Sequence, residues 1–186
     1  MKVVLLVPDA GPLISLAKAD CLDLLLLLEL PVILVDQVQF EVTRHKQFAD
    51  AVRIEQFVQS HAAEVHVFAT AVGAAAALRR AQGEVRQPGQ GEAAIAELLQ
   101  RLDEVNGDAD APVLLLYEDS DVRKSRFVLP DNVHVVSTSG FLAGLERKGL
   151  IRSAEALWER IEAAGRVPSS ATVDQPGAVA RRSTSW

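Results

Sequence analysis

Short apolar runs alternate along this chain with longer segments in which apolar residues recur at helical spacing. Runs rich in β-branched residues or Leu occur at Val133–Val136 and, without interruption, at Val3–Val7, Val32–Val35 and Val113–Leu116. Such runs are typical of parallel strands that are buried on both faces. Residues 65–68 are a further candidate for a short strand. The alternation of strands and helices predicts an α/β fold around a mainly parallel sheet.

The helical segments lie between and after these strands. Their predicted ranges are 11–19, 22–30, 37–43, 49–60, 91–104, 122–128, 139–148 and 153–164. The clearest is 91–104, because its apolar stripe consists of Ile95, Leu98, Leu99 and Leu102. Gly149 and Gly165 are plausible helix ends. Residues 71–90 are ambiguous, and a short alanine-rich helix followed by a loop is one interpretation.

The chain has 186 residues, with no internal repeat and no break in composition that marks a second domain. We therefore expect one domain over residues 1–166. Residues 167–186 are rich in Pro, Gly, Ser and Ala and lack apolar periodicity, which predicts a flexible C-terminal tail. Because 49% of residues are hydrophobic and only 5% aromatic, the core must consist mainly of Leu, Val, Ile and Ala.

Charge and cysteine content restrict the classes of function. The formal net charge of −6 disfavours binding of nucleic acid by overall charge, although basic residues cluster locally at 44–46, 79–80 and 123–126. Such clusters are more often solvated surface than ligand contacts. The single cysteine, Cys21, cannot form an internal disulfide, and no Cys/His spacing resembles a zinc site.

The apolar segments are too short for export or membrane insertion. The first apolar run is shorter than the hydrophobic region of a secretory signal peptide. The most apolar stretch, residues 21–35, is shorter than the roughly 20 residues of a membrane span and contains Asp23, Glu29 and Pro31. We expect a cytoplasmic protein that does not bind membranes.

Acidic residues follow two of the predicted strands. Asp9 follows the first strand directly, and Glu118 and Asp119 follow the strand at 113–116. In doubly wound parallel sheets the ligand site lies beyond the carboxyl ends of the strands. Three further acids can reach the same edge, namely Asp121, Glu41 in the helix after the second strand, and Glu92 behind a GQG loop.

Each of these acids also has a simpler explanation, because carboxylates are favoured at helix N-termini. Capping is the favoured interpretation of Glu92 and Asp121 taken singly, and Glu41 taken singly is an exposed helical residue. Asp9 differs, since an apolar run precedes it and GPLI follows it. Carboxylates that are brought together without a counter-charge protonate or bind a cation. The acids therefore imply a hard divalent metal, Mg²⁺ or Mn²⁺.

Five segments resemble a known family in their order and approximate spacing. They are PDAGPLISLAKAD, QFEV, GQGEAAIAEL, LLLYEDSDVRKSRF and STSGFLAGLERKGLI. The chain resembles the PIN-domain ribonucleases over residues 3–167, and especially the PIN-like proteins close to the toxins of bacterial toxin-antitoxin pairs. The resemblance implies a three-layer α/β/α sandwich with a central, mainly parallel sheet and an acidic site for one or two Mg²⁺ or Mn²⁺ ions.

The resemblance also assigns residues to the site. Asp9 matches the first catalytic aspartate of the family, Glu41 its early helical glutamate, and Glu92 the acid of its GEA motif. Its last acid matches Glu118 or Asp119, with Asp121 close by. Asp119 is the favoured residue. Glu118 is a departure from the family, since relatives often have aspartate at its position.

Two further residues match positions near the site of the family. Thr138 falls on a small hydroxyl position that could orient a ligand or water, or it caps the helix that follows. Arg123 falls on a basic position that could contact phosphate or pair with neighbouring acids.

The resulting hypothesis is metal-dependent cleavage of single-stranded RNA by an activated water, with Asp9, Glu92 and Asp119 as metal ligands. The resemblance also implies a small antitoxin partner and a homodimer, although the run Leu24–Leu28 reads as core rather than interface. One alternative is a PIN-like binding module with weak or no catalysis. A phosphoryl-acceptor domain ranks last, because VPDAGP lacks the Asp-x-Asp pair that such a site needs.

Overall fold

The computed structural model describes residues 4–85, 87–118 and 129–166. Within these ranges the strands form a five-stranded sheet that is parallel throughout, in the order β3-β2-β1-β4-β5. The strands are β1 (Leu5–Pro8), β2 (Val32–Val35), β3 (Val65–Phe68), β4 (Val113–Leu116) and β5 (Val133–Val136). The predicted parallel sheet is therefore confirmed.

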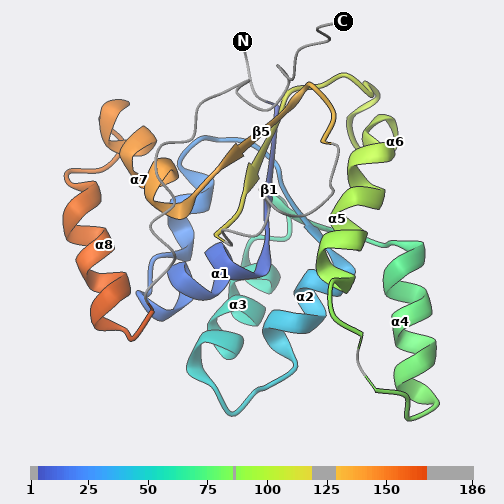
Figure 1. The fold of residues 1–186 in the computed structure, drawn as a ribbon. Helices are drawn as coiled ribbons and strands as arrows, with labels where there is room; N and C mark the ends of the chain where they lie inside the picture. Colours follow the sequence, from blue (N-terminus) through green and yellow to red (C-terminus); the bar gives the residue numbers. More distant parts are fainter. Residues whose placement is uncertain (1–3, 86, 119–128, 167–186) are drawn as a thin grey trace, which may run out of the picture.

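Helices connect these strands and cover the sheet. They are α1 (Ala10–Lys18), the 3₁₀ helix η1 (Leu22–Leu26), α2 (Asp36–Thr43), α3 (Ala49–Ser60), α4 (Ala71–Ala81), α5 (Gln90–Gln100), α6 (Leu102–Asn106), α7 (Thr138–Arg147) and α8 (Ala154–Ala163). Figure 1 shows α1, α7 and α8 on one side of the strands and α5 and α6 on the other. The predicted three-layer α/β/α sandwich is confirmed.

The hydrophobic core lies on both faces of the central strands. All four residues of β1 are buried, and β2 is likewise buried along its whole length. The stripe predicted for the helix at 91–104 is buried as well, and Leu98 is completely enclosed. Continuous apolar runs form central strands here because helices remove water from both faces of the sheet.

The strand order reverses between β1 and β4, and this position defines where a ligand site can form. From β1 the chain continues to β2 and β3 on one side of the sheet, whereas β4 and β5 lie on the other. Val7 is in register with Leu115 and Pro8 with Leu116. The segments that leave β1 and β4 therefore emerge side by side at the same edge, which is the usual ligand position in this architecture.

Two of the predicted helices are shorter than expected. The helix expected over 22–30 is only the 3₁₀ helix η1, because the chain turns at Glu29, whose φ is +53°, before it enters β2. Leu25 is buried and its neighbours between 24 and 28 pack against the core, as expected for this run. Apolar periodicity cannot reveal such a turn, because the run of consecutive Leu residues contains no polar position that would mark the end of a helix.

The helix expected over 91–104 is divided in two at Arg101, where φ and ψ are −123° and 31°. Arg101 pairs with Glu97 of α5 at 2.7 Å and with Glu104 of α6 at 2.6 Å. These two ion pairs hold the ends of α5 and α6 together across the break. The helix predicted at 122–128 and the predicted tail at 167–186 lie outside the described residues, and the domain boundary near residue 166 stays a prediction.

A polar tether fixes the start of α4 against the start of α2. The Asp36 carboxylate accepts hydrogen bonds from the Thr70 hydroxyl at 2.7 Å and from the Thr70 backbone N–H at 3.1 Å. The same hydroxyl accepts from the Gly73 N–H at 2.8 Å and so caps α4. A Cβ at Gly73 would overlap with the Asp36 carboxyl group, so a glycine is required for this approach.

We expect Gly73→Ala to lower the free energy of unfolding by about 1–3 kcal/mol, because the new methyl group displaces the Asp36 carboxylate from Thr70. Gly144→Ala is the matched control, since Gly144 also lies inside a helix but its added Cβ meets only Arg147 Nη2 at 3.9 Å. The control should gain up to about 1 kcal/mol from helix propensity. Urea unfolding of both variants measures the difference, and equal stability of the two would contradict the tether.

Candidate functional site

Asp9 lies at the point where β1 ends and α1 begins. Its backbone N–H donates to the carbonyl of Leu116, at the end of β4, at 2.9 Å. Asp9 occupies the N-cap position of α1, yet within the described chain its side chain makes no capping hydrogen bond to that helix. Helix capping therefore does not account for an acid at this position.

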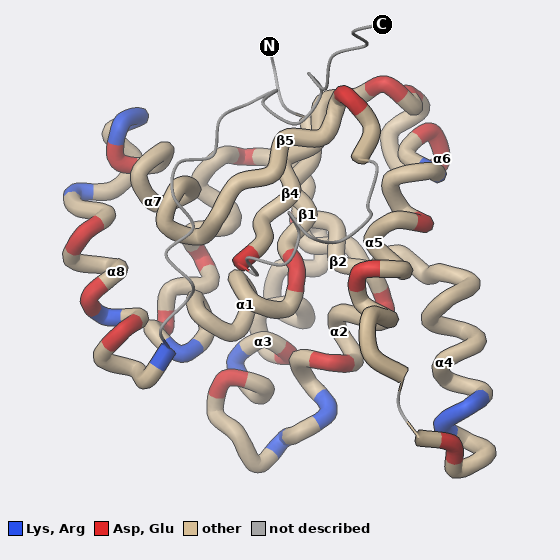
Figure 2. Tube along the Cα trace, in the orientation of Figure 1, with Lys and Arg blue, Asp and Glu red and all other residues tan. Residues whose placement is uncertain are grey.

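Burial raises the pKa of Asp9 from its ordinary value of 3.8 to about 7. The Ala10 backbone N–H lowers the pKa in part, and the negative charges of Glu92, Glu41 and Glu118 raise it further. Repulsion of this kind requires the four carboxyl groups to lie near one another. The structure thus gathers four of the predicted site residues at one edge of the sheet, where Figure 2 shows acidic segments beside α1 and at the start of α5.

Glu118, two residues beyond β4, is buried and held by a polar network. Its Oε2 accepts from the Ser15 hydroxyl at 2.8 Å and from Arg166 Nη2 at 3.2 Å, and its Oε1 accepts from the Thr138 hydroxyl. Arg166 Nε also donates to Ser15 Oγ at 3.1 Å. These contacts join α1, the start of α7 and the residues that follow α8 around one carboxylate.

Thr138 contacts the acidic site rather than capping a helix. Ser137 is the N-cap of α7, and its hydroxyl accepts from the Gly140 N–H at 3.0 Å. The Thr138 hydroxyl is therefore left to donate to Glu118. Of the two interpretations that the sequence left open for Thr138, capping is wrong.

Gly11 permits the close approach of α1 to the segment that leaves β4. A Cβ at this position would lie 2.9 Å from the Cβ of Glu118, which is closer than side-chain contacts allow. The glycine in the DAGPL motif therefore has a steric reason that the sequence alone does not reveal. It brings Asp9 and Glu118 to the same edge.

Glu41 is positioned by an amide from its own helix. Gln37, one turn earlier in α2, is buried and donates from Nε2 to Glu41 Oε1 at 3.0 Å. The Gln37 carbonyl oxygen in turn accepts from Arg80 Nη1 at 3.0 Å. The guanidinium of Arg80 lies 3.7 Å from the centre of the Phe40 ring, so a cation–π contact fixes it as well.

Glu92 lies in the first turn of α5, as predicted, where the helix dipole favours a negative charge. This turn approaches α2 closely at Gly91. A Cβ there would lie 3.3 Å from Glu41 Oε2 and 3.4 Å from the Val38 side chain. The small residue in the GQGE motif thus brings the start of α5, and Glu92 with it, beside Glu41.

The donor set matches the chemistry of a hard divalent cation, although it is incomplete in the described part of the chain. Within those residues no three Asp, Glu, His or Cys side chains are grouped closely enough to hold a metal ion as they stand. Asp119, Asp121 and Arg123 lie outside the described residues. The raised pKa of Asp9 is the observation that fits a cation, because a nearby positive charge would relieve the repulsion that raises it.

The residues that hold these acids differ in how far the sequence indicates them. Arg166 lies 48 positions from Glu118 in the chain, and no motif connects the two. Ser15 had a weak signal, since it is a polar residue in the apolar stretch LISLA and lies one turn after Gly11. Gln37 precedes Glu41 by four residues, which is the spacing of contacting side chains on a helix.

We predict that the metal-free protein loses stability as the pH rises from about 4 to about 7. In this interval Asp9 keeps its proton in the folded state but has lost it in the unfolded state. The contribution of Asp9 to the free energy of unfolding therefore falls by about 1.4 kcal/mol per pH unit. Asp9→Asn removes this contribution, whereas Asp131→Asn, an exposed aspartate before β5, should retain it. Urea unfolding in EDTA at several pH values measures the effect, and parallel pH profiles for wild type and Asp9→Asn would contradict it.

We also predict that Arg166→Gln lowers the free energy of unfolding by about 1–3 kcal/mol, because it leaves the buried Glu118 carboxylate without its cation. The loss should shrink when Glu118→Gln is present as well, and thermal melting of the single and double variants measures this coupling. Arg152→Gln, an exposed arginine in the connection before α8, is the control. Independent effects of the two substitutions would show that the ion pair does not stabilise the fold.

Comparison with known proteins agrees with this geometry. A search among curated proteins found no match. The sequence profile of a PIN-domain family matches residues 5–176, which include all the strands and helices described above. PIN domains are generally nucleases, and they typically use divalent metal ions. With an all-parallel sheet, acids gathered where the strand order reverses, and a profile match over nearly the whole chain, this protein belongs to the PIN-domain family.

Proposed function

We propose that this protein is a metal-dependent endoribonuclease that cleaves phosphodiester bonds of single-stranded RNA. The observation that carries the proposal is the environment of Asp9, a partly buried carboxyl group whose pKa is raised by burial and by the charges of Glu92, Glu41 and Glu118. Such a group binds either a proton or a cation near neutral pH. Membership of a family of nucleases makes the cation the functional choice.

Asp9, Glu92 and Asp119 are the residues that we assign as ligands of Mg²⁺ or Mn²⁺, with Glu118 and Asp121 as additional candidates. A divalent ion at such a site supplies an activated water and stabilises negative charge on the reacting phosphate. Asp9 must release its proton before it can act as a ligand, so a bound ion would lower the pKa of Asp9 from its raised metal-free value.

The remaining residues of the site position these acids. Gln37 holds the carboxylate of Glu41, a proposed catalytic residue, on the side of α2 that faces Gly91. Ser15 and Thr138 hold both oxygens of Glu118 by donating their hydroxyl hydrogens. Because hydroxyl groups can rotate, Thr138 could also orient a bound water. We keep Arg123 as a candidate contact for the RNA phosphate.

Restraint of such a nuclease would require a partner that covers the acids. We propose a toxin-like role in which a small antitoxin protein neutralises the site with a basic side chain, and we keep a homodimer as the proposed assembly.

Among the described residues, no helix combines the length and apolar character needed to cross a membrane.

A second function is favoured by the state of Glu118. Arg166 and two hydroxyl groups already neutralise this carboxylate, and it stands where relatives often have aspartate. If the other acids alone bind the ion too weakly, the protein is a PIN-like RNA-binding module with little or no catalysis. Metal titration separates the two functions, since only the nuclease requires tight binding of Mg²⁺ or Mn²⁺.

The proposal predicts that the purified protein cleaves a mixed pool of single-stranded RNA with Mg²⁺ or Mn²⁺ and not with EDTA. Asp9→Asn should lower the cleavage rate by about 10²-fold or more, because it removes a carboxylate that holds the ion. Asp131→Asn is the matched control, since this aspartate precedes β5 and so lies at the opposite end of the sheet from the acids. Cleavage that survives both EDTA and Asp9→Asn would overturn the mechanism.

A further inference from the structure

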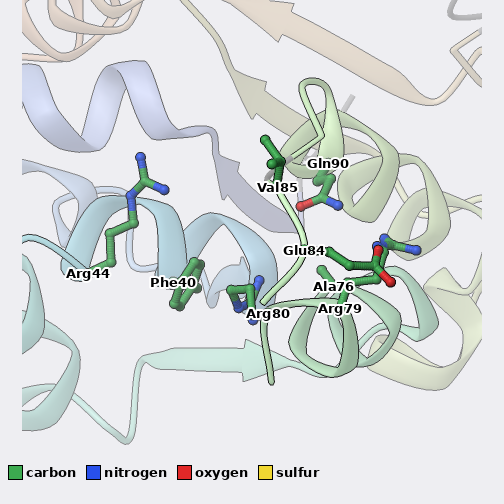
Figure 3. A pocket seen from close by; sticks show the side chains of 8 residues that line it. All are labelled: Phe40, Arg44, Ala76, Arg79, Arg80, Glu84, Val85 and Gln90. Carbon is green, nitrogen blue, oxygen red and sulfur yellow. The ribbon is translucent and has the colours of Figure 1, made fainter. Parts of the chain in front are cut away.

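An open pocket lies between α2, α4 and the start of α5. Figure 3 shows the side chains that line it, and they come from these helices and from the loop after α4. The lining residues are Phe40, Arg44, Ala76, Arg79, Arg80, Glu84, Val85 and Gln90. The proposed catalytic acids do not line this pocket.

The pocket concentrates positive charge in an acidic protein. Arg44, Arg79 and Arg80 line it together with one acid, Glu84, while the whole chain has a formal net charge of −6. Overall charge therefore cannot attract a polyanion to this protein, and local attraction must come from groups such as these. Arginine suits a phosphate ligand in particular, because its planar guanidinium donates two parallel hydrogen bonds.

One of these arginines connects the pocket to the acidic site. Arg80 stacks on Phe40 and donates to Gln37, and the amide of Gln37 donates to Glu41. The Gln37 amide nitrogen also lies 3.4 Å from the side-chain oxygen of Gln90, which lines the pocket. A single buried glutamine thus separates the cationic wall of the pocket from the proposed catalytic carboxylate.

The other two arginines have donors to offer a ligand. Arg79 Nε is buried and has no hydrogen-bond partner among the described residues. A buried donor without a partner costs free energy. Arg79 also lines the pocket, and the other N–H groups of its guanidinium are donors of the kind from which a phosphate oxygen accepts. Arg44 is exposed at the rim of the same pocket, so its guanidinium can reach a ligand without being removed from an internal contact.

We infer that this pocket binds the phosphate backbone of the RNA substrate next to the cleavage site, with Arg44 and Arg79 as the phosphate contacts. The inference rests on the proposed function for the identity of the ligand. Phe40 and Arg80 form the stacked wall that positions the strand, and Gln37 keeps this wall at a fixed position relative to Glu41.

Binding is tested without cleavage, with a fluorescently labelled single-stranded RNA of ten nucleotides in EDTA. Arg44→Gln combined with Arg79→Gln should weaken binding at least about tenfold and lower the slope of log affinity against log salt by roughly 1.4, which is about 0.7 for each phosphate contact that is lost. Lys148→Gln combined with Arg152→Gln removes the same charge from the connection between α7 and α8 and should change neither quantity. Thermal melting checks that both double variants are folded.

The result separates this inference from the proposed nuclease. The pocket assignment is overturned if the Arg44/Arg79 variant binds RNA with the affinity and salt slope of the wild type. It is also overturned if the wild type does not bind RNA in EDTA. Either result is compatible with metal-dependent cleavage that Asp9→Asn abolishes. If RNA binding depends on Arg44 and Arg79 while cleavage needs neither metal nor Asp9, the pocket assignment stands and the nuclease mechanism fails.

Discussion

Repulsion between carboxylates at one edge of the sheet is the constraint on which the rest of this structure depends. β1 and β4 are parallel neighbours, so Asp9 and Glu118 leave the sheet side by side, and Gly11 permits their segments to approach closely. Moving these acids apart would require changes in strands that are buried on both faces. Burial of those apolar strands therefore maintains an arrangement of charge that is unfavourable by itself, as the raised pKa of Asp9 shows.

The protein neutralises these acids in different ways, and the differences separate supporting groups from the reactive centre. Glu118 is held by two hydroxyls and by the guanidinium of Arg166, which stabilise its charged form from within the chain. Asp9 has no comparable cation among the described residues, and its pKa is raised despite the Ala10 N–H. A carboxyl group that the fold leaves uncompensated is the one that an external cation stabilises most.

The sequence was most informative where one physical requirement determined the structure. The runs at 32–35, 113–116 and 133–136 were predicted with the observed bounds, because short segments rich in Val, Ile and Leu favour strands. Periodicity failed at Arg101, where local ion pairs hold a break between two helices whose apolar stripe is continuous. The convergence of Asp9 with Glu118 followed from the strand-end rule, but Arg166 could not be predicted, since its contact with Glu118 exists only after α8 has packed on α1.

The arrangement around Gln37 explains how a guanidinium and a carboxylate can be linked through a neutral amide. If Arg80 bonded Glu41 directly, the ion pair would neutralise the carboxylate and occupy the guanidinium. The neutral amide of Gln37 accepts from Arg80 and donates to Glu41, so it contacts both groups without adding a charge between them. Because Gln37 is buried, water does not replace it in this role. A cationic pocket and an acidic centre can therefore adjoin in one acidic protein, which is the distribution of charge that a metal-dependent enzyme acting on a polyanion requires.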